Sequence, residues 1–350
     1  MRAPSNVADR DPDPYSDVEV ALFVAAAGLE CTVDETTPIR TGADTTYRVR
    51  VTEPDGASRR LVLKAAAWSD HERFRREPAL LAYVAETTDV PVPAVIGSHL
   101  DPTDLPAPAY LMEYVEGTTP TRQDAAGGDG VYDADTLATV ARQAGTHLAA
   151  VHDCGPLPSA GPVDVADGTL VVQDESVSWT AWLSDLVADA GDGLSRLSVA
   201  ADDVTSAIDS AMSALSGVEL VPAHYDYQPR NVLVDTDSDQ VTAVLDWGAM
   251  RSVHWEYELA LTEQYCAGWG PLDSDRRRQV RTRLYEGYRE RRPFDIDAAF
   301  RRRRRLYLLV STVATLPWAA AWEEGRADRF RRHQGQLIES LLDSLAATDS

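Results

Sequence analysis

The stretch His224-Tyr225-Asp226-Tyr227-Gln228-Pro229-Arg230-Asn231, followed by Asp246-Trp247-Gly248, decides the fold of this chain. Phosphoryl transfer needs an Asp that orients the attacking hydroxyl and accepts its proton, and an Asn five residues later and a further Asp that hold Mg²⁺ on the nucleotide phosphates. The chain contains two Asn, 37 Asp and 7 His in 350 residues. An accidental H-x-D-x-x-x-x-N is therefore expected about 0.4% of the time. The pattern predicts that Asp226 and Asn231 belong to a catalytic loop, with Asn231 and Asp246 as metal ligands.

Two short apolar runs follow this loop. Val232-Leu233-Val234 and Val241-Thr242-Ala243-Val244-Leu245 are rich in β-branched residues, and the polar segment 235–240 separates them. Such runs around a turn predict a β-hairpin. The metal ligand Asp246 then lies at the exit of the hairpin.

The distribution of basic residues singles out one position. Of the 33 basic residues, 32 are Arg and one, Lys64, is Lys. A Lys retained in such a chain is a candidate for a position that needs a compact ammonium group. Lys64 ends the strand-like run Arg60-Leu61-Val62-Leu63-Lys64, as a phosphate-pairing Lys does. The alternative is that a single Lys has survived drift without a special role.

Further motifs lie along residues 39–260. They are Ile39–Val49, Val62-Leu63-Lys64, Arg76-Glu77, Val90-Pro91-Val92-Pro93, Tyr110–Gly117, Leu148-Ala149-Ala150-Val151-His152 and Tyr257-Glu258-Leu259-Ala260. Together with the catalytic loop, these motifs resemble the aminoglycoside phosphotransferase and choline kinase family of small-molecule kinases. The resemblance extends over roughly residues 30 to 345.

The resemblance implies an α+β, two-lobed, protein-kinase-like fold with a small antiparallel-sheet N-lobe and a mostly helical C-lobe. We expect a disordered N-terminus over residues 1–16, a nucleotide-binding N-lobe over 17–116, and a C-lobe with the catalytic loop and the substrate-binding helices over 117–350. The N-lobe is expected to begin with a helix from about Asp17 to Leu29. Strands near 33–41, 45–52 and 59–64 and a helix ending near Glu86 follow. From about residue 133 onward the chain is expected to be mostly helical.

The resemblance also implies roles for N-lobe residues. Lys64 holds the nucleotide phosphates and Glu77 orients Lys64, although Pro78 beside it removes a backbone donor. The nucleotide loop contains Gly42, Thr45 and Thr46, and Asp44 places a negative charge next to the expected phosphates. Main-chain groups of Glu113, Tyr114 and Val115 form the hinge that meets the base. The implied cofactors are Mg²⁺ and ATP, with GTP also open.

The implied reaction is transfer of the γ-phosphoryl group of ATP to a hydroxyl of a small molecule. No A-P-E segment follows Asp246-Trp247-Gly248, which favours a small acceptor over a protein substrate. Tyr225, Gln228 and Arg230 depart from the Gly, His and Gly that are common in the family, so the acceptor stays open. Two alternatives remain: a nucleotide-binding pseudokinase that serves as an interaction module, and a protein kinase.

The composition constrains the environment of the protein. The net charge is −23, and self-repulsion of this size opposes compaction at low salt, whereas at 1 M salt the Debye length is about 3 Å. We therefore expect a halophilic protein that loses activity on desalting. Full activity and an unchanged melting point in dilute buffer would contradict this. An acidic surface for a cationic substrate is the rival explanation, and either one argues against nucleic acid as a partner.

Cysteine content and hydropathy point to the cytoplasm. Cys31, Cys154 and Cys266 are too few and too scattered for a disulfide framework or a zinc site. No uninterrupted apolar run of 18 residues occurs, and residues 1–17 are polar and acidic, unlike a signal peptide. We expect a soluble cytoplasmic protein that does not bind membranes, in an oligomeric state that the sequence leaves open.

Three further features favour structural roles. His147 and His152 are five residues apart, whereas helical metal pairs need a spacing of four, so packing or capping is expected. Trp179 and Trp182 belong to an apolar stripe in the segment 173–217, which resembles the family's substrate-binding insert. Core packing is the default for this stripe, and a cage for a substrate cation is the alternative. The run Arg301–Arg305 cannot form one helical stripe, and we expect a solvated ion-pair face.

Overall fold

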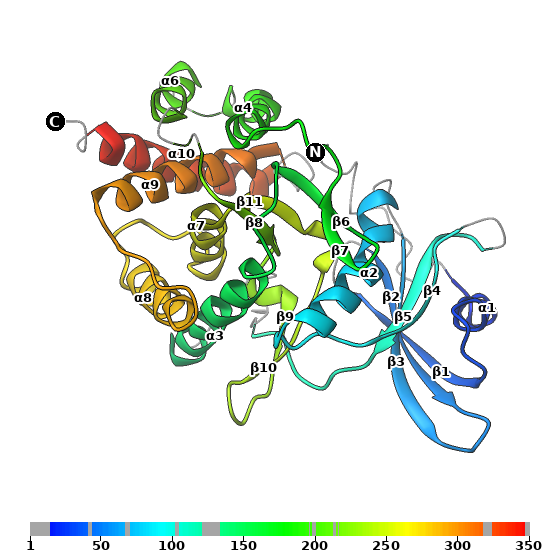
Figure 1. Ribbon diagram of the computed structural model, residues 1–350. Coiled ribbons are helices and arrows are strands. Elements are labelled where there is room, and N and C mark those ends of the chain that lie inside the picture. Colours follow the sequence, from blue (N-terminus) through cyan, green and yellow to red (C-terminus); the bar gives the residue numbers. More distant parts are fainter. Residues whose placement is uncertain are drawn as a thin grey trace.

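The computed structural model describes residues 15–40, 44–66, 71–101, 105–120, 134–195, 197, 201–212, 215, 217–317 and 324–346. It confirms the expected α+β fold, with a small lobe built on an antiparallel sheet and a larger, mostly helical lobe (Figure 1). The predicted disorder of residues 1–16 falls largely outside the described residues. Its last two residues are ordered by contacts, because Tyr15 packs edge-on against Phe23 and Ser16 caps the first helix.

The small lobe contains α1 (Asp17–Ala26), β1 (Thr32–Ile39), β2 (Thr45–Thr52), β3 (Ser58–Ala65), α2 (His71–Thr87), β4 (Val95–His99) and β5 (Ala109–Glu113). The strands form one antiparallel sheet in the order β1-β2-β3-β5-β4. Strand alternation decides which way each side chain points. Leu61 and Leu63 of β3 are buried in a core shared with Val20 and Phe23 of α1. Lys64 therefore points to the opposite face of the sheet.

The larger lobe begins with α3 (Ala134–His152), β6 (Gly161–Ala166), β7 (Thr169–Val172), α4 (Trp179–Asp189), α5 (Gly191–Leu194), α6 (Ala201–Met212) and β8 (Leu220–Ala223). It continues with the short 3₁₀ helix η3 (Pro229–Asn231), β9 (Val232–Val234), β10 (Val241–Val244), η4 (Trp247–Ala249) and β11 (Arg251–His254). The chain ends with α7 (Trp255–Cys266), α8 (Asp275–Arg289), α9 (Ala298–Ala314) and α10 (Glu324–Ala346).

The predicted hairpin is present, since β9 and β10 pair antiparallel with Val232 opposite Val244. A second sheet, in the order β7-β6-β11-β8, was not predicted from sequence. Its strands are only four to six residues long, and prolines interrupt the usual strand patterns, as Pro162 does in β6 and Pro222 in β8. Pairing across the chain, rather than local preference, stabilises these strands.

Helices α3 and α8 touch backbone to backbone in the core of the larger lobe. A Cβ atom at Gly145 would lie 2.1 Å from the carbonyl oxygen of Leu284, and one at Gly287 would lie 1.9 Å from that of Arg142. Both positions therefore require glycine, because any side chain would force the helices apart. This contact fixes the position of α3, whose C-terminal end supports the catalytic loop.

The two histidines of α3 make structural contacts, as expected. His147 Nδ1 lies 2.9 Å from the Tyr227 hydroxyl, and His152 is fully buried between Tyr288 and Glu258. The apolar stripe of α4 also packs as expected, with Trp179 and Leu183 in the core of the larger lobe and Trp182 partly buried at its edge.

The expectation of a solvated face at Arg301–Arg305 is wrong for two members of the run. Arg303 Nε lies 2.8 Å from Glu256, and Arg304 Nε lies 2.7 Å from Glu263. Both carboxylates are buried in α7, which packs against α9. Long guanidinium side chains can reach such interior partners while their stems cover apolar surface. Within the described residues, no helix is long and apolar enough to cross a membrane.

Candidate active site

The catalytic loop is held from behind by a buried polar chain. The backbone N–H of Tyr225 donates to Glu258 Oε1 at 2.7 Å, and the other oxygen of Glu258 lies 2.6 Å from His152 Nε2. His152 Nδ1 in turn contacts the Tyr288 hydroxyl at 2.8 Å. Two motifs distant in sequence, Leu148–His152 and Tyr257–Ala260, thus meet beneath the loop. Buried and satisfied networks of this kind hold one conformation.

His224 links the loop to the strand that carries the second carboxylate. Its Nδ1 accepts a hydrogen bond from the backbone N–H of Asp226 at 3.2 Å, so its Nε2 is protonated and donates to the carbonyl oxygen of Leu245 at 2.9 Å. Leu245 N also donates to the carbonyl oxygen of Asn231 at 2.8 Å. These bonds fix the relative positions of Asp226 and Asp246.

The carboxylate of Asp226 is clamped by its own loop. Asn231 Nδ2 donates to Asp226 Oδ2 at 3.0 Å and to its backbone oxygen at 2.9 Å, and Gln228 Nε2 donates to Oδ1 at 2.6 Å. Burial is the main cause that raises the pKa of Asp226 to about 6, with a further contribution from Asp246. A carboxylate with a pKa in this range can both accept and release a proton near neutral pH.

Asp246 adopts a left-handed backbone conformation, with φ 68°, between β10 and η4. Its Oδ1 lies 3.1 Å from Lys64 Nζ and its Oδ2 lies 3.4 Å from Arg73. Burial opposes the charge on Asp246, but Lys64 and Arg73 outweigh it and hold its pKa well below the ordinary value. Asp246 is therefore an anion at every physiological pH.

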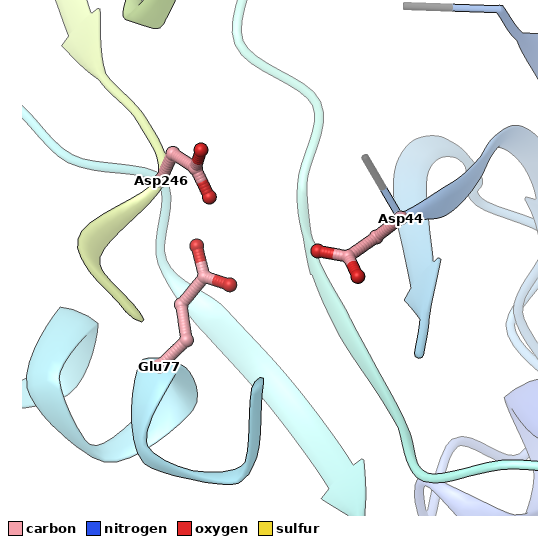
Figure 2. A group of neighbouring side chains, drawn as sticks. All are labelled: Asp44, Glu77 and Asp246. Carbon is pink, nitrogen blue, oxygen red and sulfur yellow. The ribbon is translucent and has the colours of Figure 1, made fainter. Parts of the chain in front are cut away.

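Lys64 lies at the centre of three carboxylates, a group we call the carboxylate-rich cluster (Lys64, Asp44, Glu77 and Asp246). Lys64 Nζ lies 2.7 Å from Glu77, 3.1 Å from Asp246 and 3.2 Å from Asp44. Figure 2 shows how the carboxylates converge: Glu77 points up from α2, Asp246 comes from the turn after β10, and Asp44 approaches from the start of β2. Burial disfavours the ammonium, but Asp246 and Glu77 outweigh it and raise the pKa of Lys64.

The predicted pairing of Glu77 with Lys64 is thus present, and Pro78 does not prevent it. Helix α2 continues through Pro78 to Thr87. The turn after Asp246 allows α2 to approach, because a Cβ atom at Gly248 would lie 2.8 Å from the carbonyl oxygen of Arg73. Glycine at this position lets the helix bring Arg73 to Asp246 and Glu77 to Lys64.

Oxygen ligands of Asp44, Glu77 and Asp246 lie within 4.8 Å of one another, which is close enough for a shared cation. The Lys64 ammonium is that cation here, and its single positive charge compensates the three carboxylates only in part. Asn231 offers a further oxygen beside Asp226. Because its Nδ2 donates to Asp226, its Oδ1 is left as an acceptor to which no described group donates. Amide and carboxylate oxygens are the ligands that Mg²⁺ prefers.

Arg73 is a site residue that the sequence interpretation missed. Its charge acts most strongly on Asp246 and then on Asp226, and these carboxylates raise its pKa despite burial. It lies 3.4 Å from Asp246, and its charge also acts on Asp226. The signal was available, because Arg73 is four residues before Glu77 on a predicted helix and shares its face.

The hinge residues join the lobes. The backbone N–H of Glu113 donates to Ala94 O at 2.8 Å and that of Tyr114 to Arg60 O at 3.4 Å, while no described group accepts from Val115 N–H. Beyond the hinge, Thr118 exchanges backbone hydrogen bonds of 3.0 and 2.9 Å with Val234 of the hairpin. Among the three predicted hinge residues, Val115 thus has the amide that is available to a ligand.

The nucleotide loop is described in part. Gly42 lies outside the described residues. Thr45 and Thr46 begin β2, where Thr46 pairs with Lys64 across the sheet and Thr45 pairs with Ala65. The predicted loop thus ends beside Lys64, and among the described residues neither threonine side chain hydrogen-bonds to it.

A catalytic-loop Asp, a β3 Lys paired with a helix Glu, and a second Asp after a hairpin, arranged between a sheet lobe and a helical lobe, define a protein-kinase-like phosphotransferase. The model of the phosphotransferase enzyme family matches residues 35–294, and the chain belongs to this family. The protein is therefore a phosphotransferase by family.

Solved structures of low sequence identity share the fold. A protein assigned as an aminoglycoside phosphotransferase from Ralstonia eutropha JMP134 is 15% identical, with a TM-score of 0.61 over 95% of this chain and 98% of that one. Macrolide 2′-phosphotransferase MphH from Brachybacterium faecium is 18% identical, with a TM-score of 0.59 over 92% and 98%. A thermostable mutant of aminoglycoside phosphotransferase APH(4)-Ia, in complex with AMP-PNP and hygromycin B, is 18% identical, with a TM-score of 0.60 over 96% and 99%. No curated protein matches the chain.

Proposed function

We propose that the protein transfers the γ-phosphoryl group of ATP, in a Mg²⁺-dependent reaction, to a hydroxyl of a small molecule. The observation that carries this proposal is the position of the Lys64 ammonium group. Its nitrogen lies 2.7 Å from Glu77 of the small lobe and 3.1 Å from Asp246 of the large lobe. Phosphoryl transfer depends on such preorganised charge more than on covalent chemistry. Residues 17–116 and 117–350 would then act as the nucleotide-binding and catalytic lobes.

Asp226 is the group that receives the acceptor hydroxyl. Gln228 and Asn231 hold one carboxylate oxygen each, so the rotamer is fixed before the substrate arrives. With a pKa of about 6, the carboxylate is mostly ionised at neutral pH and basic enough to accept a proton as the hydroxyl attacks. Positioned general bases typically contribute about 10² to 10⁴ in rate.

The donor set of the cleft fits Mg²⁺. Asp246 would supply carboxylate oxygens and Asn231 its amide Oδ1, which are hard oxygen ligands. Mg²⁺, when bound, neutralises charge on the phosphates. Lys64 and Arg73 supply protein cations on the same side of the cleft, and Glu77 keeps Lys64 in place.

The base of the nucleotide is proposed to lie against the hinge. Val115 N–H is available to donate a hydrogen bond to an acceptor atom of the base, whereas the Glu113 and Tyr114 amides already donate to protein carbonyl groups. Main-chain groups recognise a purine edge without a contribution from their side chains, so the hinge is compatible with ATP and with GTP.

A small acceptor fits the path of the chain after the second carboxylate. Asp246 is followed within five residues by β11, which pairs with β8 over its whole length. This leaves no room for the long activation segment that docks protein substrates in protein kinases.

The test is a phosphorylation screen of a metabolite pool with labelled ATP and Mg²⁺ in molar KCl, comparing wild type with Asp226→Ala. A product made by wild type alone supports the proposal and names the acceptor. Mg²⁺-dependent binding of AMP-PNP without any product would support a pseudokinase instead. Label on added proteins would support a protein kinase.

A further inference from the structure

Three aromatic side chains, Tyr225, Trp182 and Tyr257, pack together next to the catalytic Asp226, and we call them the aromatic wall. Tyr225, the neighbour of Asp226 in the chain, makes an edge contact with Trp182 of α4 at 5.8 Å between ring centroids and stacks on Tyr257 at 6.2 Å. Tyr225 is only half-buried. Its backbone has φ 69°, a left-handed conformation that is strained for a non-glycine residue. Strain retained beside a reactive carboxylate points to a use for the side chain.

The guanidinium of Arg251 lies over this wall. Arg251 begins β11 opposite Ala223 of β8, two residues before Tyr225, and its Cζ is 5.1 Å from the centre of the Tyr225 ring. The ring therefore holds the guanidinium through a cation–π contact. A stacked guanidinium keeps its N–H edge free, and that edge matches a carboxylate or phosphate with two parallel hydrogen bonds.

Within the described residues, Arg251 forms no ion pair, and its buried Nε has no hydrogen-bond partner. The half-buried arginines of α9 are different, because Arg303 and Arg304 each pair with a buried glutamate. Buried donors are usually satisfied, since an unpaired one is costly. In a chain of net charge −23, a partly buried arginine without a carboxylate indicates a place for an anion from outside.

A second arginine, Arg230, adds positive charge near Asp226. Arg230 is exposed in the catalytic loop and forms no ion pair within the described residues. Its charge acts on Asp226 and on the Tyr265 hydroxyl, as does that of Arg73. Cationic acceptors would meet like charge at this side of the cleft, whereas an anionic group would be attracted.

We infer that the acceptor of the proposed reaction is a hydroxyl compound that also bears an anionic group, a carboxylate or a phosphate, which binds to the N–H edge of Arg251 beside Tyr225. Asp226 receives the hydroxyl of the same molecule. This inference rests on the proposed function, and it distinguishes the chain from an enzyme that accepts polycationic amino sugars.

The test uses a metabolite extract separated by ion exchange into anionic, neutral and cationic fractions, each incubated with labelled ATP, Mg²⁺ and wild type. We expect labelled product from the anionic fraction alone. Treating that fraction with phosphatase beforehand separates the two sources of charge: surviving label assigns a carboxylate, and lost label assigns a phosphate. Product from the neutral or cationic fraction would overturn the inference while leaving the proposed function intact. Mg²⁺-dependent AMP-PNP binding with no product in any fraction would refute both.

Variants of Arg251 test the residue itself. At limiting amounts of the anionic fraction, we expect Arg251→Gln to lower the rate about 10- to 100-fold and Arg251→Lys to restore part of it, because hydrogen bonds to charged groups are lost and then partly replaced. AMP-PNP affinity should stay at the wild-type value, which also shows that the variants fold. Arg301→Gln, at an exposed arginine, is the matched control. A wild-type rate in Arg251→Gln would overturn the assignment.

Discussion

Two ion clusters in this protein have opposite arrangements of charge. In the carboxylate-rich cluster, one Lys64 ammonium lies among Asp44, Glu77 and Asp246. In the arginine-rich cluster, one carboxylate, Glu263 of α7, lies among Arg277, Arg281 and Arg304 of α8 and α9.

The clusters differ in solvent access. The central carboxylate Glu263 is 0% exposed, although Arg281 and Arg304 are 28% and 14% exposed, whereas Asp246 is 32% and Asp44 21% exposed. A carboxylate that is sealed from solvent, as Glu263 is, can only hold helices together. An open cluster with excess negative charge can exchange its partners for a ligand or a cation. Solvent access and the sign of the uncompensated charge, rather than ion pairing as such, therefore separate a reactive cluster from a structural one.

The largest effect is expected from removing the negative charge of Asp246, the most exposed member of the carboxylate-rich cluster. Asp246→Asn removes the anion that Lys64 and Arg73 share, so Mg²⁺-dependent AMP-PNP binding should be lost and turnover should fall by about 10³ or more. Calorimetric titration with and without Mg²⁺ measures the binding, and circular dichroism checks the fold. Wild-type Mg²⁺ dependence would remove Asp246 from the metal site.

Breaking the arginine-rich cluster should instead affect stability. Glu263→Gln leaves three guanidiniums without their common carboxylate, which should lower the free energy of unfolding by about 3 to 5 kcal/mol. Urea unfolding measures this change. The activity of the remaining folded protein should be retained, because Glu263 is sealed from the cleft. A loss of turnover without a loss of stability would contradict the structural role.

A third variant tests Arg73, whose positive charge acts on both Asp246 and Asp226. Arg73→Met should lower kcat about 10²-fold with little change in the KM for ATP, because a preorganised charge near the transferred phosphoryl group is removed. Arg73→Lys should recover part of kcat. Arg75→Gln, at an exposed arginine of the same helix, should behave as wild type. If KM rises while kcat is unchanged, Arg73 serves binding alone.

A smaller effect of opposite sign is expected at Asp44. Its carboxylate lies 3.2 Å from Lys64 Nζ, where it would compete with the phosphates of the proposed nucleotide. Asp44→Asn removes this competing charge and should tighten AMP-PNP binding about fivefold, or roughly 1 kcal/mol. Equilibrium titration measures it. Weaker binding would show that Asp44 assists the nucleotide rather than competing with it.

A pH-dependent effect is expected at His254, a buried residue whose Nδ1 lies 2.8 Å from the Tyr307 hydroxyl. Burial, with a contribution from Arg303, lowers its pKa to about 3. Below an unfolded pKa of about 6.5, the unfolded chain therefore binds a proton that the folded protein does not, and stability falls as the pH falls. The slope is about 1.4 kcal/mol per pH unit. Between pH 6 and 4.5, His254→Gln should show a shallower decline in unfolding free energy than wild type, and an equal decline would contradict the shift.

Much of the site was predictable where the chemistry is local. Asp226 and Asn231 are five residues apart, and the loop between them closes through their own hydrogen bonds. The direction of the Lys64 side chain was also predictable, because Lys64 ends a strand in which successive side chains point to opposite faces. The second sheet was not predictable, because strands of four residues carry too little pattern. Arg73 was missed since its importance comes from the approach of α2 to the turn at Gly248.

The sequence by itself determined the reaction class, the loop with its spacing and the identity of the residues that carry charge, because these depend on short-range covalent spacing and on rare residue types. Only the tertiary structure decided which charges are compensated. Arg303 and Arg304 lie in the same run as the exposed Arg301, yet they reach buried glutamates, while Arg251 lies over an aromatic ring without a carboxylate. Electrostatic interaction depends on distance and burial in space, and neither can be read from the local pattern of residues along the chain.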